Sequence, residues 1–354
     1  MRTHSIRKIG IVLFGILGDV LTRTPTVREI RRLFPGAHIE CFVDPIGFEA
    51  LQNSPDIDSF KVVIRSRRDR LRYLESKIYI FLYLVTHRFD LFIDLYGNST
   101  SNLMSLLAHS KKRIVVANGT VEARGLDAKY DRINFVNPHH LSNASLEILR
   151  FFPLDTVSLD TRPVIDSDFQ GMKLTEKKYI DDFIKLRGSF FLLSAGSGDA
   201  KKVITPAICA DTARAVSQRK GPVPVLLFNP GAKDVQKEIA QEFDREGILY
   251  YKFPPLSVPA VAYLIKRSAF VVVSDSGILH LTVALEIPFF GVFTYTPPEE
   301  VVPSNGIFET CFKPDPAGKA YGSRGLVYGD RELTRADLLP KLEKFLDRIG
   351  VGTQ

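Results

Sequence analysis

Several short stretches place reactive side chains directly after an apolar run. The first is FGILGD, in which Gly18 and Asp19 follow the apolar segment 8–14. A carboxylate at the end of a buried strand suits a general base, which takes a proton from a reacting hydroxyl. The same position suits a helix cap, because an Asp side chain accepts hydrogen bonds from free backbone N–H groups. Both interpretations stay open for Asp19.

The strongest local signal is VVVSDSGILHLTVALEIP. A strand ending at Ser274, a tight turn and a following helix would present free backbone N–H groups at a sheet edge, where phosphates bind. Gly277 would let the backbone approach closely, Ser276 would add a hydroxyl donor next to Asp275, and His280 would lie about one helical turn further on. An ordinary helix cap with a His packed on the sheet would give the same spacing.

A second glycine loop occurs in LLSAGSGDAKKVITP, which contains Ser194 and Gly196 followed by Lys201 and Lys202. It is not a P-loop, because no Lys-Ser/Thr pair follows a GxxxxG frame, and it lacks the third glycine of the dinucleotide fingerprint. A lysine at this position could reach a phosphate, and a solvated lysine is equally compatible with the pattern. In NPGAKDVQKE, Asp234 or Glu238 could accept hydrogen bonds from ribose hydroxyls, or could simply begin a surface helix.

The elements that must position these residues alternate between short apolar runs and helix-like segments, which is typical of parallel α/β units. Strands are predicted at 8–14, 38–44, 89–97, 112–119, 189–198, 223–231, 248–253, 269–275 and 288–294. Helices are predicted at 24–34, 99–110, 175–188, 204–220, 234–247, 258–268, 277–287 and 334–350. The helix at 24–34 is expected to have Thr24 as its N-cap and Pro25 as its first residue.

A further helix is predicted where apolar residues recur at helical spacing. The residues of this face are Leu71, Leu74, Ile78, Phe81, Leu82 and Val85.

A chain of 354 residues is long for one hydrophobic core, so two domains are expected. The predicted organisation is an N-terminal doubly wound domain at 1–155, a polar linker at 156–180, a second such domain at 181–333, and a C-terminal helix and tail at 334–354. The sequence does not decide whether 305–330 is an ordered loop.

The chain carries a net charge of +7, and much of that excess lies at 61–77, which holds seven basic and two acidic residues. This segment is either a solvated helix face or a surface for an anionic partner such as membrane headgroups or a phosphorylated acceptor. No nucleic-acid-binding module is recognisable, so no nucleic acid partner is expected. The three cysteines form no CxxC pair, which favours neither a zinc site nor a disulfide framework and is typical of the cytoplasm. No apolar run is long enough to span a membrane, so a soluble protein is expected.

Taken in their order, these motifs resemble the ADP-heptose:lipopolysaccharide heptosyltransferases, glycosyltransferase family nine. The matching stretches are FGILGDVLTRTPTVREIRRLFPGAHIECFV, FDLFIDLYGN, SAGSGDAKKVITP and SDSGILHLTVALEIPFFGVF. The resemblance implies a GT-B fold, in which two Rossmann-like doubly wound domains face each other across a cleft. The N-terminal domain would bind the acceptor and the C-terminal domain the nucleotide sugar. It also implies an inverting reaction without a metal ion or any other cofactor.

The resemblance assigns a role to each candidate residue. Asp19 falls on the catalytic aspartate, and Lys202 on the lysine that steadies the leaving diphosphate. The other donor-side residues are Ser194, Gly196, Asp234 toward the ribose, Asp275 toward the sugar, and Ser276, Gly277 and His280 at the phosphate-binding turn. The acceptor-side residues are Gly18 and Asn98.

The chain also departs from the family pattern. Leu13 stands where members commonly carry a basic residue, the tryptophan expected near Ile204 is missing, and the loop FGILGD contains no serine. The donor and acceptor therefore stay open: ADP-heptose or another nucleotide sugar, and a lipopolysaccharide core, another glycan or a protein hydroxyl. A hydrolase or epimerase on the same scaffold and a non-catalytic nucleotide-sugar-binding protein are the alternatives. The expected partners are a nucleotide sugar and a glycan or lipid-linked acceptor, met in the cytoplasm at the inner face of the bacterial inner membrane, where 61–77 would contact anionic lipid.

Overall fold

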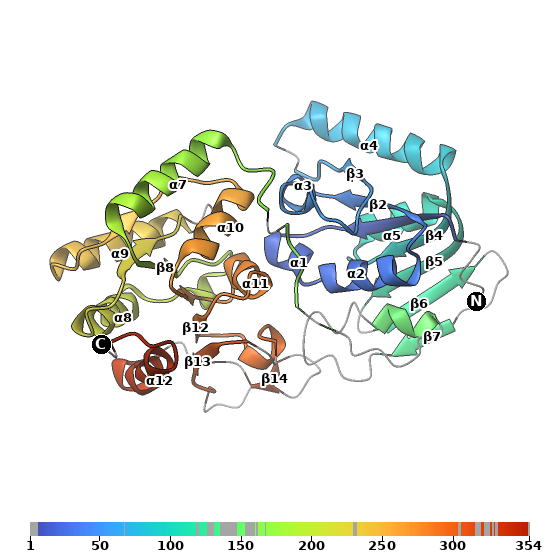
Figure 1. Cartoon of the computed structure of the whole chain (residues 1–354). Helices are drawn as coiled ribbons and strands as arrows, with labels where there is room; N and C mark the ends of the chain where they lie inside the picture. The colour runs from blue at the N-terminus through green and yellow to red at the C-terminus, as the bar shows by residue number, and fades with distance from the viewer. Residues whose placement is uncertain are drawn as a thin grey trace. The chain divides into compact units, whose positions relative to one another are not determined.

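The protein is described here by a computed structural model, which covers residues 6–66, 68–117, 120–125, 131–134, 147–152, 160, 162–166, 168–228, 232–303, 306–315, 320–321, 326–327, 329 and 332–352. The chain divides into two compact units, Met1–Gly171 and Met172–Gln354, and each contains its own large β-sheet (Figure 1). The segment 156–180, expected to be a linker, contributes residues to both units. Its residues 156–159, 161 and 167 lie outside the described part.

The first unit is built on a seven-stranded sheet with the strand order β3-β2-β1-β4-β5-β6-β7. Its elements are β1 (Lys8–Leu13), α1 (Leu17–Leu21), α2 (Thr24–Leu33), β2 (His38–Val43), α3 (Pro45–Leu51), β3 (Ser59–Val62), α4 (Arg70–Thr86), β4 (Arg88–Asp94), α5 (Ser99–Leu107), β5 (His109–Ala117), β6 (Thr120–Gly125), β7 (Asp131–Asn134) and the 3₁₀ turn η2 (Glu147–Phe151). Strands β1 to β5 run parallel; β1, β2, β4 and β5 were predicted as strands, whereas β3 was not. Strands β6 and β7 extend the sheet antiparallel, which the sequence pattern did not indicate.

The central strands of this sheet are buried on both faces, which explains their nearly continuous apolar sequences. Phe42, Phe89 and Phe92 form an aromatic cluster in the core, with ring centroids 5.4 to 6.2 Å apart. The Phe92 ring packs directly over Gly10, where a Cβ atom would lie only 2.6 Å from its Cδ2. A side chain at position 10 would therefore displace the core of the first unit.

Helix α2 begins differently from the prediction. Thr24 is already the first helical residue, and Arg23 occupies the N-cap, because the additional short helix α1 comes just before it. Thr24 Oγ1 donates to the Leu21 carbonyl at 2.7 Å and accepts from the Val164 N–H at 2.7 Å. The hydroxyl therefore joins α1 to a segment distant in sequence instead of capping α2.

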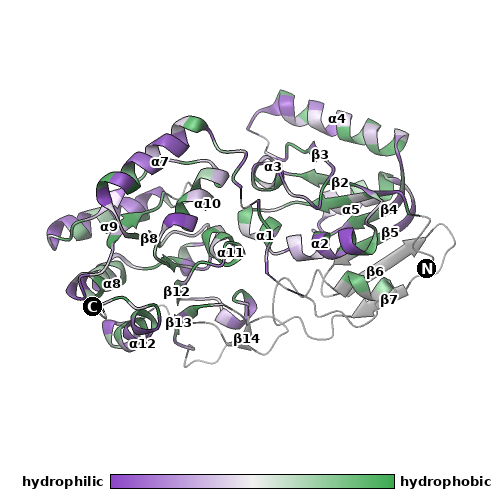
Figure 2. Cartoon of the chain, in the orientation of Figure 1, coloured by the Kyte–Doolittle hydropathy of each residue, from purple (hydrophilic) through white to green (hydrophobic). Residues whose placement is uncertain are grey.

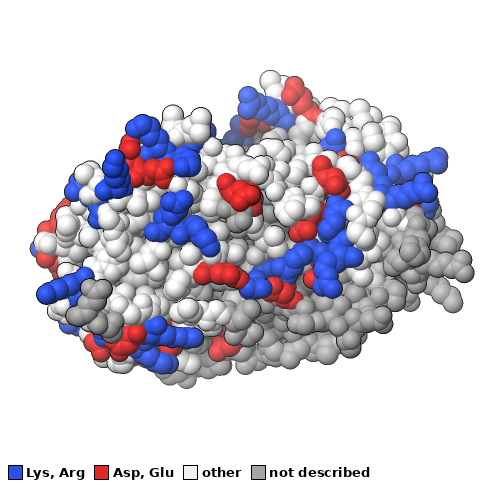
Figure 3. Space-filling model, in the orientation of Figure 1, with Lys and Arg blue, Asp and Glu red and all other residues white. Residues whose placement is uncertain are grey.

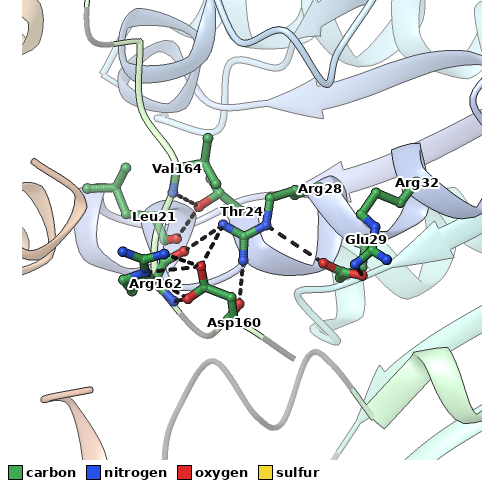
Figure 4. A network of polar contacts seen from close by, with 8 residues as sticks. All are labelled: Leu21, Thr24, Arg28, Glu29, Arg32, Asp160, Arg162 and Val164. Atoms are coloured by element: carbon green, nitrogen blue, oxygen red, sulfur yellow. Dashed lines mark hydrogen bonds and ion pairs between the residues drawn. The ribbon is translucent and has the colours of Figure 1, made fainter. Parts of the chain in front are cut away.

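The segment around Val164 is held to α2 by a polar network (Figure 4). Arg28 donates to the main-chain oxygens of Asp160 and Arg162. Arg162 in turn donates two hydrogen bonds to the Asp160 carboxylate, from Nε to Oδ1 at 3.0 Å and from Nη2 to Oδ2 at 2.8 Å. These bonds hold the pKa of Asp160 below its usual value. Asp160 and residues 162–164 thus belong structurally to the first unit.

The second unit is built on a six-stranded parallel sheet with the strand order β10-β9-β8-β11-β12-β13. Its elements are α7 (Leu174–Arg187), β8 (Phe190–Ser194), η3 (Ala200–Lys202), α8 (Pro206–Gln218), β9 (Val223–Leu226), α9 (Lys233–Arg245), β10 (Tyr251–Lys252), α10 (Val258–Arg267), β11 (Val271–Val273), α11 (Gly277–Ala284), β12 (Phe289–Phe293), η4 (Pro298–Glu300), β13 (Phe308–Phe312), β14 (Ala320–Tyr321), β15 (Leu326–Val327) and α12 (Arg335–Arg348). The predicted strands and helices of this half all occur.

In the C-terminal region, the sequence left open whether 305–330 is ordered and predicted a separate helix and tail at 334–354. Within 305–330, the described residues form the edge strand β13 and the short antiparallel pair β14–β15. Residues 305, 316–319, 322–325, 328 and 330 lie outside the described part. Helix α12, expected as a separate C-terminal element, buries Leu338, Leu342 and Phe345 in the core of the second unit.

In both sheets the strand order reverses at one internal position. The reversal lies between β1 and β4 in the first unit and between β8 and β11 in the second. In open α/β sheets, the carboxyl ends of the strands at such a reversal form the usual ligand-binding position. Each unit therefore has one topologically defined place for a site.

Candidate functional site

In the first unit, the reversal brings together the loop after β1 and the loop after β4. The Leu95 N–H donates to the Val12 carbonyl at 3.1 Å, which fixes the two loops side by side. Asp19 follows β1, and Asp94 ends β4. Asp94, which sequence reasoning did not select, therefore ends its strand next to the loop that leads to Asp19.

The Asp19 side chain is half-buried and caps its own helix. It is the third residue of α1, and its Oδ2 accepts from the Ile16 N–H at 3.2 Å. The capping interpretation is thus confirmed in the structure. Capping uses one carboxylate oxygen, so it is compatible with a chemical role for the other.

Gly15 is required by the way this loop approaches Asp19. Its φ is +132°, in the region that favours glycine, and a Cβ atom there would lie 2.4 Å from Asp19 Cβ. The Gly15 N–H donates to Asp44 Oδ2 at 2.8 Å. The loop is therefore held against Asp19 from one side and against Asp44 from the other.

Asp44 and Arg65 form a two-pronged ion pair behind this loop. Arg65 Nε lies 2.6 Å from Asp44 Oδ1, and Arg65 Nη2 lies 2.8 Å from Asp44 Oδ2. The guanidinium also stacks near the Phe14 and Tyr96 rings, 5.0 Å from each centroid. Although burial lowers its pKa, the bonds to Asp44 and Tyr96 outweigh this and raise the pKa of Arg65. Arg65, counted in the basic segment 61–77, is thus a structural cation of the site.

Arg23 supplies a second, partly buried cation beside Asp19. Its Nη1 donates to the main-chain oxygen of Asp19 at 2.5 Å, and its guanidinium lies 5.5 Å from the Tyr96 ring centroid. Burial lowers the pKa of Arg23, while the charges of Asp19 and Asp94 act in the opposite direction. Sequence reasoning did not select Arg23, because the break between α1 and α2 at which it lies was not predicted.

Asp94 is fully buried at the end of β4. Its Oδ1 accepts the N–H groups of Tyr96 and Gly97 at 2.9 and 3.0 Å, and so shapes the loop that follows. Its Oδ2 is buried without a hydrogen-bond partner within the described residues. Burial raises the pKa of Asp94, and the N–H of Gly97 and the charge of Arg23 only partly offset this.

The two predicted acceptor-side residues both have local structural roles. Gly18 is buried within α1. Asn98 is the N-cap of α5, and its side chain accepts from the Ser101 N–H at 2.9 Å. Neither observation tests binding of an acceptor, so the acceptor roles of both residues stay predictions.

In the second unit, the reversal joins the two glycine loops singled out in the sequence. Val273 pairs with Ser194 in the sheet, and the Ser274 N–H donates to the Ser194 carbonyl at 3.1 Å. One step further, Ser274 Oγ donates to the Gly196 carbonyl at 3.1 Å. Ser197 Oγ donates to the Asp275 carbonyl at 3.0 Å. Side chains therefore hold the two loops together beyond the end of the sheet.

Lys202 and Asp275 meet across these loops. Lys202 Nζ lies 2.6 Å from Asp275 Oδ2, and the buried Thr296 hydroxyl donates to the same oxygen at 2.6 Å. Lys202 is partly exposed, whereas Lys201 is fully exposed with its Nζ 4.9 Å from the Tyr295 ring centroid. The structure thus distinguishes the two lysines and brings Lys202 into the site. Sequence reasoning missed Ser197, although it lies within the glycine loop SAGSG, and Thr296, which belongs to no recognisable motif.

The start of α11 supplies the backbone donors of this site. Ser276 is the N-cap and Gly277 the first helical residue, as the sequence predicted. The Ser276 side chain does not cap the helix, and its Oγ, like that of Ser194, is buried without a hydrogen-bond partner among the described residues. His280 is buried one turn further along the helix. Free N–H groups, the positive end of the helix dipole and Lys202 together favour an anion.

Asp234 is the predicted donor-side residue that the structure does not connect to the anion site. It is exposed in the first turn of α9, and no described contact joins it to Lys202 or Asp275. A pocket opens beside it at the ends of β8 and β9, lined by Leu193, Ala195, Gly196, Leu226, Leu227, Ala232, Val235, Gln236 and Ile239. The pocket adjoins Gly196 of the anion site, and its volume of about 10 Å³ leaves room for about one water molecule.

Among the residues that the structure describes, no group of three or more His, Cys, Asp or Glu side chains could hold a metal ion. The described cysteines are all buried and free.

The chain resembles known proteins in sequence and in fold. Residues 81–313 match the model of glycosyltransferase family 9 (heptosyltransferase). A search of curated proteins found no match.

Among solved structures, a glycosyl transferase family 9 protein from Veillonella parvula DSM 2008 has a TM-score of 0.75 at 15% identity, covering 97% of this chain and 98% of that one. E. coli heptosyltransferase WaaC with ADP gives 0.68 at 18% identity, covering 96% and 99%. E. coli ADP-heptose lps heptosyltransferase II gives 0.67 at 14%, also covering 96% and 99%. These likenesses confirm the predicted fold class.

Proposed function

This chain belongs to glycosyltransferase family 9, the heptosyltransferases, and on that premise we propose that it transfers a heptose or a related sugar from ADP-heptose to a lipopolysaccharide core or another glycan. The assignment of ADP as the leaving group draws on the solved structures named above, one of which contains ADP. The acceptor and the sugar are proposals made from the chemistry of the two sites.

The anion site of the second unit carries the proposal. Lys202, the free N–H groups at the start of α11 and the unpartnered Ser276 hydroxyl converge at the sheet reversal. A diphosphate bound there would meet two kinds of fixed positive charge as its own negative charge increases during bond cleavage. The ion pair with Asp275 holds Lys202 in place before the diphosphate binds.

Asp19 is the proposed base in the first unit. In the reaction, the acceptor hydroxyl oxygen forms a bond to the anomeric carbon, the bond from that carbon to the diphosphate breaks, and the diphosphate departs with the electron pair. The hydroxyl proton goes to Asp19. A single displacement of this kind inverts the anomeric centre. The bond from Ile16 and the close approach of Gly15 hold the carboxylate in one orientation.

The proposed mechanism needs no metal ion, because Lys202 and the helix start neutralise the leaving diphosphate. We expect transfer to proceed at the same rate after treatment with EDTA and removal of the chelator. A loss of activity that a divalent cation restores would contradict this part of the proposal. We place the reaction at the cytoplasmic face of the bacterial inner membrane, where a lipid-linked acceptor would be displayed.

The direct test is ADP release from ADP-heptose with and without a lipopolysaccharide-core acceptor. The proposal predicts release that depends on the acceptor and a product whose anomeric configuration is opposite to that of the donor. Rapid release without an acceptor would identify a hydrolase instead. Conversion of the sugar without release of ADP would identify an epimerase.

A further inference from the structure

Helix α4 presents an apolar face that nothing in the described structure covers. The six residues at helical spacing, Leu71, Leu74, Ile78, Phe81, Leu82 and Val85, have exposed fractions between 39% and 75%. They form a stripe about 100° wide along the helix. Figure 2 shows how densely apolar residues occur along this helix. A surface helix of a monomeric protein normally turns such a stripe inward.

The orientation of α4 is fixed by its opposite side. Ile80 and Leu84 are buried in the core of the first unit with Phe42 and Phe89. Tyr83 donates to Glu40 Oε2 at 2.9 Å, and Ser76 Oγ accepts from the Ile64 N–H at 2.9 Å. The outward stripe is therefore an additional apolar face, and α4 is apolar on two opposite sides.

Basic side chains border the stripe. Arg68, Arg70 and Arg72 are exposed at the N-terminal end of the helix, and Lys77 lies along its flank. Figure 3 shows basic side chains, with acidic ones beside them, at the upper edge of the view over the N-terminal end of α4. Between residues 61 and 77 the sequence contains only two acidic residues, Asp69 and Glu75. Lys61 and Arg65 do not belong to this border, because Glu40 and Asp44 engage them, and Arg67 lies outside the described residues.

We propose that α4 lies flat on a membrane surface rich in anionic lipids, with its six-residue apolar stripe inserted among the acyl chains and its arginines on the headgroups. An outward-facing apolar stripe bordered by basic residues is the arrangement with which a helix binds the bilayer interface. Tyr79, exposed beside the stripe, adds an aromatic side chain of the kind found at this depth. No helix among the described residues is long and apolar enough to cross a membrane.

The charges favour lipid over a second copy of this chain. In a symmetric pair, each stripe would meet another stripe with the same basic border, and only Asp69 and Glu75 would offer opposite charge. Asp69 already accepts from the Arg72 N–H at 3.1 Å. An anionic bilayer supplies both the missing negative charge and the missing apolar cover.

Vesicle binding tests the proposal without donor or acceptor, so its outcome is independent of the proposed transfer reaction. The purified full chain is mixed with vesicles of phosphatidylcholine alone or with phosphatidylglycerol, and the bound fraction is measured by flotation. We expect binding only to the anionic vesicles. The variant Arg68→Gln/Arg70→Gln should bind about 30-fold more weakly at low salt, from about 1 kcal/mol per basic residue, and the difference should shrink at high salt. Equal binding of this variant and the wild type would overturn the proposal.

The apolar stripe is tested with Leu74→Gln/Ile78→Gln/Leu82→Gln, whose positions are all exposed, so the fold should persist. We expect at least about tenfold weaker vesicle binding. The matched control is Leu174→Gln/Leu186→Gln on α7, which changes two leucines that are more exposed still. Wild-type binding by the triple variant would refute insertion.

Insertion itself can be read from fluorescence, because the chain contains no tryptophan. Leu82→Trp should show a blue shift of emission on anionic vesicles, whereas Leu186→Trp should not. A blue shift that grows with protein concentration without vesicles would assign the stripe to a second copy. A blue shift already present at high dilution would assign it to another part of this chain. Either result would overturn the proposal.

Discussion

At Asp19 a structural contact and a proposed chemical role share one carboxylate. The variant Asp19→Asn separates them, because an amide oxygen can still accept from the Ile16 N–H but cannot take a proton. We expect transfer to fall by a factor of about 10² to 10⁴, with the melting temperature and ADP affinity nearly unchanged. Steady-state turnover and thermal unfolding of the same preparation check this. Wild-type turnover in Asp19→Asn would remove the residue from the mechanism.

Thr296 is the polar contact that sequence reasoning missed in the anion site. Thr296→Val removes the 2.6 Å bond to Asp275 and should cost about 1 to 2 kcal/mol of unfolding free energy. It should also weaken ADP binding, because Asp275 positions Lys202.

The control for this prediction is Thr212→Val, which removes an equally buried hydroxyl from the Ile208 carbonyl within α8. Its stability should fall by a similar amount in urea unfolding, with ADP affinity retained. If both variants bind ADP as the wild type does, Thr296 has only a structural role.

The candidate residues that sequence identified are those attached to a motif. Lys202, Ser276, Gly277 and Asp19 each follow a strand in a glycine-containing loop, and the structure places them at the two sheet reversals. Arg23 lacks such a marker because its contact with Asp19 depends on the unpredicted break between α1 and α2. Thr296 lacks one because it meets Asp275 from 21 residues away. The exposure of Asp234 could not be predicted from a helix start alone.

At the scale of elements, the turn from β1 into α1 depends on Gly15. Gly15→Ala would place a methyl group against Asp19 at a positive φ, and we expect a loss of about 2 to 3 kcal/mol in unfolding free energy. Transfer should fall as well, since Asp19 must move. Gly36→Ala is the control, because no heavy atom lies within 4 Å of the added methyl. Equal stability of the two variants in urea would contradict this account of the turn.

The folding stability should depend on pH through the carboxyl of Asp94, which shapes the loop after β4. Burial raises the pKa of this carboxyl above its ordinary value of 3.8, so the folded state binds the proton more tightly than the unfolded state. Its contribution to stability is complete below that ordinary value and is lost as pH rises through the raised pKa.

The comparison that checks this is Asp94→Asn against the wild type in urea at several pH values. As pH rises from about 4 to about 7, the stability of the variant should improve relative to the wild type. A difference that does not change with pH would show that the carboxyl titrates normally.

Periodicity predicted that α4 is a helix, but it could not show which side faces the core. The helix is apolar both at Ile80 and Leu84 and along the six-residue stripe. The hydrophobic pattern alone does not show which of the two sides is buried. The antiparallel strands β6 (TVEARG) and β7 (DRIN) were missed because both are short and contain no apolar run. The N-cap of α2 shifted because the short helix α1 has too few residues to show a period.

At the scale of the whole chain, alternating strands and helices were enough to predict two parallel α/β units. That pattern is robust because a buried parallel strand needs an apolar sequence and a crossover helix needs an amphipathic one. The sequence also predicted that reactive loops follow strands. The topology then explains why they gather, since only one reversal per sheet brings two such loops together.

The most direct test of the central claim is calorimetric titration of the full chain with ADP, UDP, GDP and NAD in parallel. The account predicts selective binding of ADP and a loss of at least about tenfold in affinity for Lys202→Ala, because the variant removes the cation and leaves Asp275 facing the diphosphate. The control Lys237→Ala removes an exposed lysine of α9 and should bind ADP as the wild type does. Preference for UDP or GDP, or unchanged ADP affinity in Lys202→Ala, would contradict the proposed donor site.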